Sequence, residues 1–165
     1  MSKNSDKLLK LLEINDVRFI DSHESLLSMD GWSGEDDKVN LNNSVAVARD
    51  DPERRGEFFV VHARYEMTFS EKQKDGEESK DFFKAVYILE VVFKSKKPEE
   101  VLKLLEDEEL KKFFFKKQLN HTLWPILRAR IMNAFSNHSL KPLVLPWLKP
   151  LKESGEKSST SPKSE

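Results

Sequence analysis

Residues 58–69, FFVVHARYEMTF, alternate between two kinds of side chain along most of their length. One face is wholly apolar and carries Phe59, Val61, Ala63, Tyr65, Met67 and Phe69. The other face is mostly polar and carries His62, Arg64, Glu66 and Thr68. A period of two residues is typical of an antiparallel strand with one buried and one solvated face. The stretch therefore predicts a strand that covers a core.

A second strand is predicted at residues 81–93, DFFKAVYILEVVF, after a long polar turn at 70–80. Its first face is entirely apolar and consists of Phe83, Ala85, Tyr87, Leu89, Val91 and Phe93. The opposite face is half apolar, because it includes Val86, Ile88 and Val92. A strand that is apolar on both faces needs cover on both, either from its own chain or from another copy.

Upstream of this pair the sequence predicts two more strands, at residues 16–23 and 38–47. In the second of them Val39, Leu41, Val45 and Val47 share one face. The segment between them, 29–37, contains two glycines and an acidic cluster, which is typical of a loop. Before the first strand, residues 5–13 place four leucines behind a serine or aspartate cap, which predicts a short amphipathic helix.

Downstream of the strands the pattern becomes helical. Pro98 suits a first helical position, and the two glutamates that follow it suit the positive end of a helix. A second helix is predicted from a cap at Asp107 to about Ser136, with an apolar stripe at i+4 spacing that comprises Leu119, Leu123, Leu127, Ile131 and Phe135. Pro125 lies inside this helix and removes one backbone hydrogen bond, so we expect a kink or interruption near His121.

The segment that follows, SLKPLVLPWLKP at residues 139–150, is almost wholly hydrophobic, and we name it the apolar arm. Its prolines at 142, 146 and 150 exclude a helix and a central strand. We therefore expect it to run extended over another surface. Such a segment can form the wall of a groove in which an extended peptide binds, or it can cap the core of its own chain.

The amino-acid composition limits the class of protein to which the chain can belong. With 35% charged and 38% hydrophobic residues, the 165-residue chain is expected to form one soluble domain at 14–151, after an extension at 1–13 and before a disordered polar tail at 152–165. The net charge of −1 argues against a large nucleic-acid surface, and the absence of cysteine excludes thiol chemistry. We see neither a signal peptide nor a membrane-spanning stretch, so we expect a cytoplasmic protein without membrane insertion.

Motifs for catalysis or for metal binding are missing from the sequence. The four histidines are scattered without ligand spacing, and no glycine-rich phosphate loop or serine–histidine arrangement occurs. We therefore expect no enzyme activity, no cofactor and no metal.

Residues 111–121, KKFFFKKQLNH, interleave lysine and phenylalanine and could stack nucleic-acid bases. The alternative is that the phenylalanines pack in a core or interface while the lysines extend around them. We favour this alternative and expect no nucleic-acid partner.

Two consecutive segments, WPILRARI at 124–131 and LKPLVL at 140–145, resemble the SecB family of export chaperones. In the first, the matching positions are Trp124, Pro125, Arg128 and Ile131. In the second they are Leu140, Pro142, Leu143 and Leu145, which follow without a gap. The strand-rich front half agrees in order and spacing, so the resemblance covers about residues 14 to 147.

The resemblance implies an α+β fold with a four-stranded antiparallel sheet, a long C-terminal helix and an extended, proline-containing crossover arm. It also implies a dimer of dimers that holds unfolded polypeptides in hydrophobic grooves without ATP. The groove residues that we infer are Leu41, Val45, Leu140, Leu143, Val144, Leu145 and Trp147. The oligomer contacts that we infer are Ala85, Tyr87, Leu89, Leu123, Leu127 and Ile131.

Two departures from the family pattern affect the partners. The family commonly has a Gly-Gly turn after the helix, where this chain has His138 and Ser139. Members that act in export are strongly acidic and often carry a C-terminal helix, and both features help to engage the translocase motor SecA. The near-neutral charge and polar tail of this chain therefore argue against SecA, and a solitary SecB-like chaperone that guards an antitoxin fits at least as well.

The sequence therefore predicts a holdase for unfolded client polypeptides, active in protein export or as a solitary SecB-like chaperone, and assembled as a homo-tetramer. The alternative is an oligomeric adaptor or structural protein of the same fold, with one fixed partner. Exposure distinguishes them, because a holdase must leave apolar area in contact with water after assembly.

Overall fold

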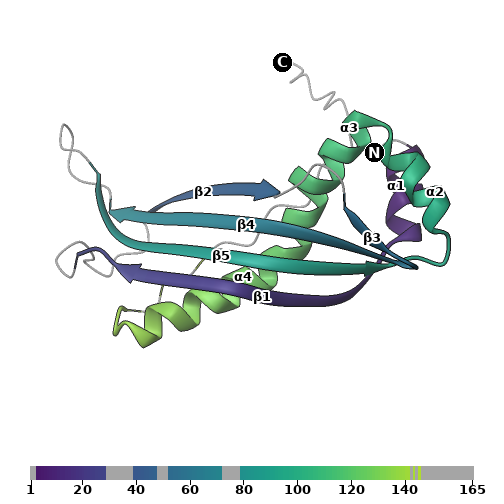
Figure 1. The fold of residues 1–165 in the computed structure, drawn as a ribbon. Helices are drawn as coiled ribbons and strands as arrows, with labels where there is room; N and C mark the ends of the chain where they lie inside the picture. Colours follow the sequence, from purple (N-terminus) through teal and green to yellow (C-terminus); the bar gives the residue numbers. More distant parts are fainter. Residues whose placement is uncertain are drawn as a thin grey trace, which may run out of the picture.

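The computed structural model describes residues 3–28, 39–47, 52–71, 79–141, 143 and 145. An antiparallel sheet forms one layer, and a long C-terminal helix lies across it (Figure 1). The strands of the sheet are β1 (Glu13–Leu26), β2 (Val39–Val47), β3 (Glu53–Arg55), β4 (Phe58–Glu71) and β5 (Lys80–Lys94).

The sheet has the strand order β1-β5-β4-β2, with the short β3 paired to β4 beside this path. The four predicted strands are therefore present, and β3 is an additional fifth strand. β1 and β2 follow one another in the sequence and lie at opposite ends of this path.

The two central strands pair as their alternation predicts. In the β4–β5 register, Phe59 lies opposite Phe93, Tyr65 opposite Tyr87 and Phe69 opposite Phe83. All twelve residues of the two predicted apolar faces are buried. On the second face of β5, Val86, Ile88 and Val92 are half-buried, so this face lacks the full cover that its composition favours.

The described residues form five helical segments: α1 (Lys3–Leu11), α2 (Pro98–Leu105), α3 (Glu108–Phe113), the π-helix η2 (Phe114–Gln118) and α4 (Leu119–Asn137). The first three lie at one end of the sheet (Figure 1). The helix predicted at residues 5–13 is present as α1, but it begins at Lys3 and ends at Leu11, so the predicted cap at Ser5 or Asp6 is wrong because both residues lie inside the helix. The cap predicted at Asp107 is confirmed, because one of its carboxylate oxygens accepts the backbone N–H of Glu109 at 3.0 Å and of Leu110 at 3.1 Å. In the described part of the chain, no helix is long and apolar enough to cross a membrane.

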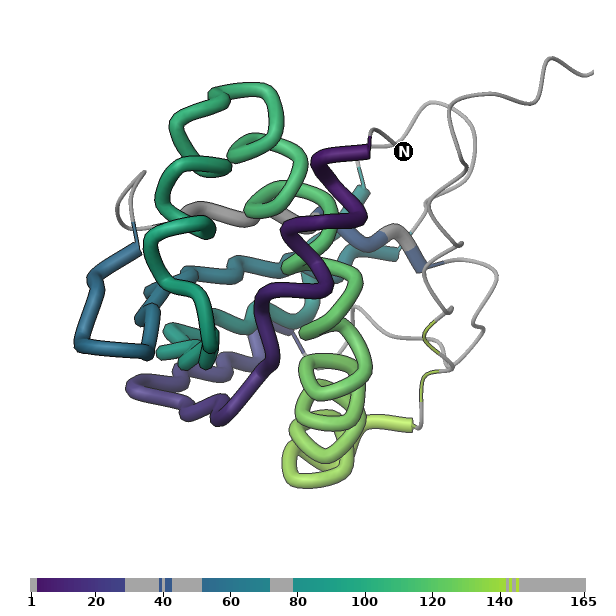
Figure 2. Tube along the Cα trace, turned by 90° about the vertical axis from the view of Figure 1, so that its right-hand side faces the viewer, coloured from purple at the N-terminus to yellow at the C-terminus, as the bar shows by residue number. Residues whose placement is uncertain are grey.

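The long helix is interrupted earlier than we predicted. Pro125 lies within α4, while the departure from α-helical geometry is the wide π turn at Phe114–Gln118. Both Phe114 and Phe115 in this turn are buried, so the lysine–phenylalanine segment contributes side chains to the core. Figure 2 shows α1 crossing beside the start of this long helix, at one end of the molecule.

The core lies between the sheet and α4. Phe135 on the last turns of α4 packs against Phe69, Phe82 and Phe83, with ring centroids 4.8 to 6.1 Å apart. The helix positions that predicted the i+4 stripe are buried along their whole length. Burial of this stripe fixes which face of α4 meets the sheet and leaves the opposite face in water.

Candidate functional site

The apolar arm begins at a sharp turn after α4. Ser139 adopts the left-handed conformation, with φ of 56°. The N–H of Ser139 donates to the carbonyl of Ser136 at 3.1 Å, and the N–H of Leu140 donates to that of Phe135 at 2.9 Å. This pair of bonds is the Schellman motif. A turn is therefore formed where the family commonly has two glycines, and Ser139, rather than His138, takes the left-handed position.

The described arm residues return along the helix and enter the core. Leu143 is 4% exposed and Leu145 is 3% exposed, and both belong to the core cluster. The Nε atom of Arg128 donates to the backbone carbonyl of Leu145 at 2.8 Å. Because Arg128 lies well before the end of α4, the arm must double back beside the helix to reach it.

Arg128, which binds this returning segment, belongs to one row of side chains along α4. Asn120, Trp124 and Arg128 are four residues apart, so they lie above one another on successive turns. Trp124 is 2% exposed, and the hydrogen bond of Arg128 to Leu145 is half-buried. The arginine of the sequence motif therefore has a physical role, because it binds the backbone of the arm, and Trp124 lies one turn before it on the same row.

The structure describes the side chains of four of the predicted groove residues, Leu41, Leu140, Leu143 and Leu145. Leu41 on β2 and Leu140 are half-buried against the cluster that contains Leu143 and Leu145. Val45 lies opposite Tyr65 in the backbone register of β2 and β4, while its side chain, like Val144 and Trp147, lies outside the described part. The burial of Leu143 and Leu145 matches the expectation that the arm caps its own core. The groove itself stays a prediction.

The six predicted oligomer contacts lie between the sheet and α4. Each is fully buried within the single chain: Ala85, Tyr87, Leu89, Leu123, Leu127 and Ile131. A partner that approached β5 would meet its opposite face, where Val86, Ile88 and Val92 are half-buried. The oligomer interface stays a prediction.

A polar cluster on the β1 side of α4 was not predicted from the sequence. The hydroxyl of Tyr87 donates to Glu24 Oε1 at 3.0 Å, and Arg130 Nε lies 3.2 Å from the same oxygen. The Arg130 guanidinium also lies 5.8 Å from the ring centre of Phe19. Burial raises the pKa of Tyr87, and the nearby Glu24 carboxylate raises it further. The cluster ties α4 to both β1 and β5.

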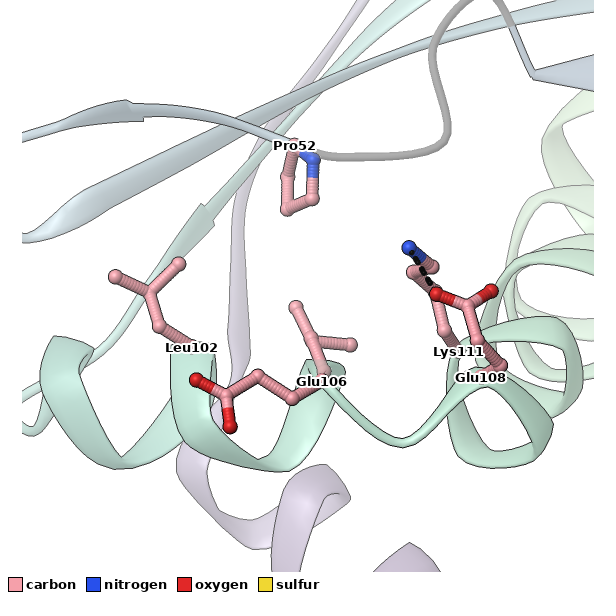
Figure 3. Close-up of a pocket in the computed structure, with 6 residues that line it drawn as sticks. Pro52, Leu102, Glu106, Glu108 and Lys111 are labelled. Carbon is pink, nitrogen blue, oxygen red and sulfur yellow. Dashed lines mark ion pairs between the residues drawn. The ribbon is translucent and has the colours of Figure 1, made fainter.

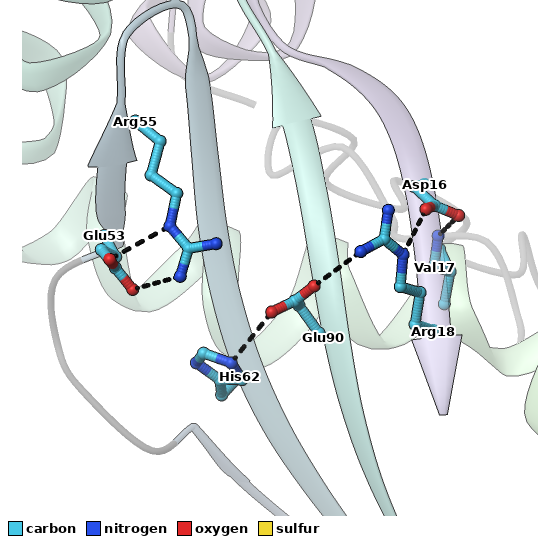
Figure 4. A network of polar contacts seen from close by, with 7 residues as sticks. All are labelled: Asp16, Val17, Arg18, Glu53, Arg55, His62 and Glu90. Carbon is cyan, nitrogen blue, oxygen red and sulfur yellow. Dashed lines mark hydrogen bonds and ion pairs between the residues drawn. The ribbon is translucent and has the colours of Figure 1, made fainter. Parts of the chain in front are cut away.

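The sheet face that points away from α4 carries charges in pairs (Figure 4). Glu90 lies between two basic groups, with its oxygens 3.4 Å from His62 Nε2 and 3.5 Å from an Arg18 nitrogen. Arg18 in turn binds Asp16 at 2.6 Å. The contacts of Arg18 and His62 therefore link β1, β5 and β4 across this face through Glu90.

A second carboxylate on this face has the same arrangement. Glu66 lies 2.6 Å from Lys84 Nζ and 2.8 Å from an Arg64 nitrogen. Lys84, with a smaller contribution from Arg64, holds the pKa of Glu66 below its usual range. The charged residues of this face thus form ion-paired clusters around Glu66 and Glu90.

Two hollows open on the described surface. One has a volume of about 410 Å³ and is lined by Pro52, Leu102, Leu105, Glu106, Glu108 and Lys111 (Figure 3). Its Lys111 and Glu108 form an ion pair of 2.8 Å. The other has a volume of about 220 Å³ and is lined mainly by apolar residues: Leu9, Leu12, Ile14, Phe93, Phe114, Gln118, Leu119 and Thr122. Among the described residues, no group of three or more histidine, aspartate or glutamate side chains could hold a metal ion.

No protein-family model matches the sequence, and no curated protein matches it either. Among solved structures, the fold is similar to that of Mycobacterium tuberculosis Rv1957, a SecB-like chaperone in complex with a ChAD peptide from the Rv1956 HigA1 antitoxin. The TM-score is 0.61 and the identity 15%, over 88% of this chain and 97% of that chain. A protein of unknown function from Streptococcus agalactiae has a TM-score of 0.35 and 14% identity, over 81% of this chain and 94% of that chain, and supports no argument. The chain has a SecB-like fold, with the expected antiparallel sheet and C-terminal helix.

Proposed function

We propose that the protein is an ATP-independent holdase, which binds unfolded polypeptides in a groove beside the apolar arm and keeps them from aggregating. The observation that carries this proposal is the return of an apolar, proline-containing segment along α4 of a SecB-like fold, held by the Arg128–Leu145 hydrogen bond. Such a segment presents both apolar side chains and backbone groups to an extended chain.

The single chain also exposes apolar side chains on its described surface, some on or beside β1 and some on α4. Six large hydrophobic residues are between 36% and 55% exposed: Ile14, Phe19, Ile20, Leu27, Ile126 and Met132. Burial of apolar area contributes about 25 cal/mol per Å², so several weak contacts along one client add up to useful affinity. Binding of this kind has broad specificity, because it reads hydrophobicity and not a fixed sequence.

Assembly into a homo-tetramer is part of the proposal, and the sheet offers a surface for it. β1 is a strand of 14 residues at the end of the strand order, and no described strand pairs with its outer edge. A long edge strand with apolar residues favours pairing with another chain. We propose that two copies join along β1, in addition to any contact through β5 and α4.

The proposed partner class includes an antitoxin segment. The similar Rv1957 structure contains an antitoxin peptide, and the sequence departures fit a solitary SecB-like chaperone, for example one that guards an antitoxin, at least as well as an export factor. The net charge of −1 and the ion pairing of Glu66 with Lys84 are unlike the strongly acidic character that supports docking to SecA. We propose a solitary chaperone in preference to an export factor, and we expect it in the cytoplasm.

A second candidate is an oligomeric adaptor with one fixed partner. It is favoured by the burial of Leu143 and Leu145, since these side chains are used by the core of their own chain. In this case the arm would stay closed, and the apolar surface would serve assembly alone.

Suppression of aggregation separates the two candidates. A chemically unfolded client is diluted into the protein without ATP, light scattering is followed, and the oligomer mass is measured in parallel. A holdase suppresses scattering at near-stoichiometric amounts and keeps its oligomer mass. A well-folded oligomer that leaves scattering unchanged would contradict the holdase and favour the adaptor.

A further inference from the structure

Among the described residues, two buried side-chain atoms have no hydrogen-bond partner, the Tyr65 hydroxyl and Asn120 Oδ1. Tyr65 is 0% exposed and lies on the face of β4 that packs toward α4. A buried polar atom without a partner destabilises a fold, and native chains contain few of them. Each of these two atoms therefore needs an explanation, and binding of a ligand is one that fits.

Comparison with Tyr87 shows that burial of a tyrosine does not by itself leave the hydroxyl unpaired. Tyr65 and Tyr87 are direct cross-strand partners on the same face, and both are 0% exposed. The Tyr87 hydroxyl donates to Glu24, whereas that of Tyr65 has no partner. Phenylalanine, which fills much of this core, would occupy the site of Tyr65 without a penalty. Burial also raises the pKa of Tyr65, so its hydroxyl keeps the proton and can donate.

Asn120 lies on the row of α4 that already binds the backbone of an extended segment. Arg128, two turns further on in this row, donates to the carbonyl of Leu145. An arginine satisfies a backbone carbonyl, while an amide oxygen satisfies a backbone N–H. Since an extended chain offers both groups along its length, Asn120 is suited to accept from a segment that follows the same row.

We propose that Tyr65 and Asn120 bind the main chain of an extended client, with Asn120 accepting a backbone N–H and Tyr65 donating to a backbone carbonyl. This inference rests on the proposed function and adds the atoms that recognise the client. Both atoms are inaccessible in the free protein, so the client reaches them only when the packing around them opens. Because the main chain is common to all polypeptides, such contacts strengthen binding without limiting it to one sequence.

The test uses the full-length protein and a short, fluorescently labelled peptide rich in leucine and phenylalanine. Tyr65→Phe and Asn120→Leu each remove one proposed contact, and each should weaken peptide binding by about two- to ten-fold. Neither should lower the Tm, since each also removes an unpaired buried atom. The matched control is Tyr87→Phe, which loses a formed hydrogen bond and should lower the Tm while leaving peptide affinity unchanged.

Peptides that are N-methylated at single amides provide a readout that a merely structural role would not change. Methylation of the amide whose N–H is accepted by Asn120 should weaken peptide binding to the wild type. The same methylation should cause no further loss of peptide affinity in Asn120→Leu. Unchanged affinity in both variants would overturn the inference and leave the holdase standing. An absence of peptide binding by the wild type would overturn both this inference and the proposed holdase function. If Tyr65→Phe fails to fold, Asn120→Leu and the methylated peptides decide the question.

Discussion

Glu24 is the residue on which the attachment of α4 to the β1 side of the sheet depends, because it binds Tyr87 and Arg130 together. Glu24→Ala would leave the Tyr87 hydroxyl buried without an acceptor and would free Arg130. We expect a loss of about 1.5–3 kcal/mol in the free energy of unfolding, measured by urea denaturation. Glu13→Ala on the exposed start of the same strand is the control and should stay within about 0.5 kcal/mol of the wild type. A similarly small loss for Glu24→Ala would contradict this account.

Ser139 is the residue at which backbone strain can be relieved. Its φ of 56° is unfavourable for a side chain with a Cβ atom, and glycine adopts it freely. Ser139→Gly should therefore raise the free energy of unfolding by about 0.5–1 kcal/mol, as read from thermal and urea transitions. Ser136→Gly, inside the last turn of α4, should lower it by a similar amount. Equal effects at the two positions would show that the turn is not strained.

Glu66 gives the stability a defined dependence on pH. Lys84 lowers the pKa of Glu66 in the folded chain, so the ionised carboxylate contributes stability at pH values above its ordinary pKa of 4.5. This contribution is lost as the pH falls through the pKa of the folded state. We expect the urea midpoint of the wild type to fall more steeply below about pH 4.5 than that of Glu66→Gln. Parallel pH profiles for the two proteins would rule out this ion pair as a source of acid sensitivity.

At the scale of elements, the apolar arm and α4 determine which candidate function holds. Leu143 is in the core, so Leu143→Ala should destabilise the protein by about 2–4 kcal/mol in urea denaturation. Leu27→Ala, at a position that is 51% exposed, is the control and should change stability by less than about 0.5 kcal/mol. A loss below about 1 kcal/mol for Leu143→Ala would mean that the arm is held loosely and is open to clients without displacement.

The regular elements were predictable because their patterns repeat. The period of two in β4 and β5 and the i+4 stripe of α4 reflect which side chains face the core, and the Asp107 cap is a local signal. β3 has only three residues, all exposed, so no alternation could mark it. The π turn was missed because its widening depends on how Phe114 and Phe115 reach the core, which periodicity does not express.

The site was predictable only in part. The prolines and leucines of the arm indicated an extended apolar segment, but nothing local showed that Leu143 and Leu145 would be buried. Contacts such as that of Glu24 with Arg130 join residues that are far apart in the sequence, so only the folded topology brings them together. The unpaired hydroxyl of Tyr65 has the same origin, because the sequence gives no sign of which tyrosine finds a partner.

At the scale of the whole molecule, the free edge of β1 predicts how copies assemble. Ile20 lies at one of the two register shifts of this strand and is 55% exposed. Ile20→Lys places a charge on the edge, which discourages strand pairing between chains. We expect a smaller mass for this variant by light scattering after size exclusion, with an unchanged folded monomer. Wild-type mass in the variant would move the interface away from β1.

The central claim is that the assembled protein holds unfolded chains without ATP. The most direct measurement is the mass of its complex with a permanently unfolded client, determined by light scattering after size exclusion without nucleotide. We predict a stable complex whose mass equals one oligomer plus bound client, and no complex with the same client in its native state. A protein that elutes at the mass of its free oligomer beside the unfolded client would contradict the claim.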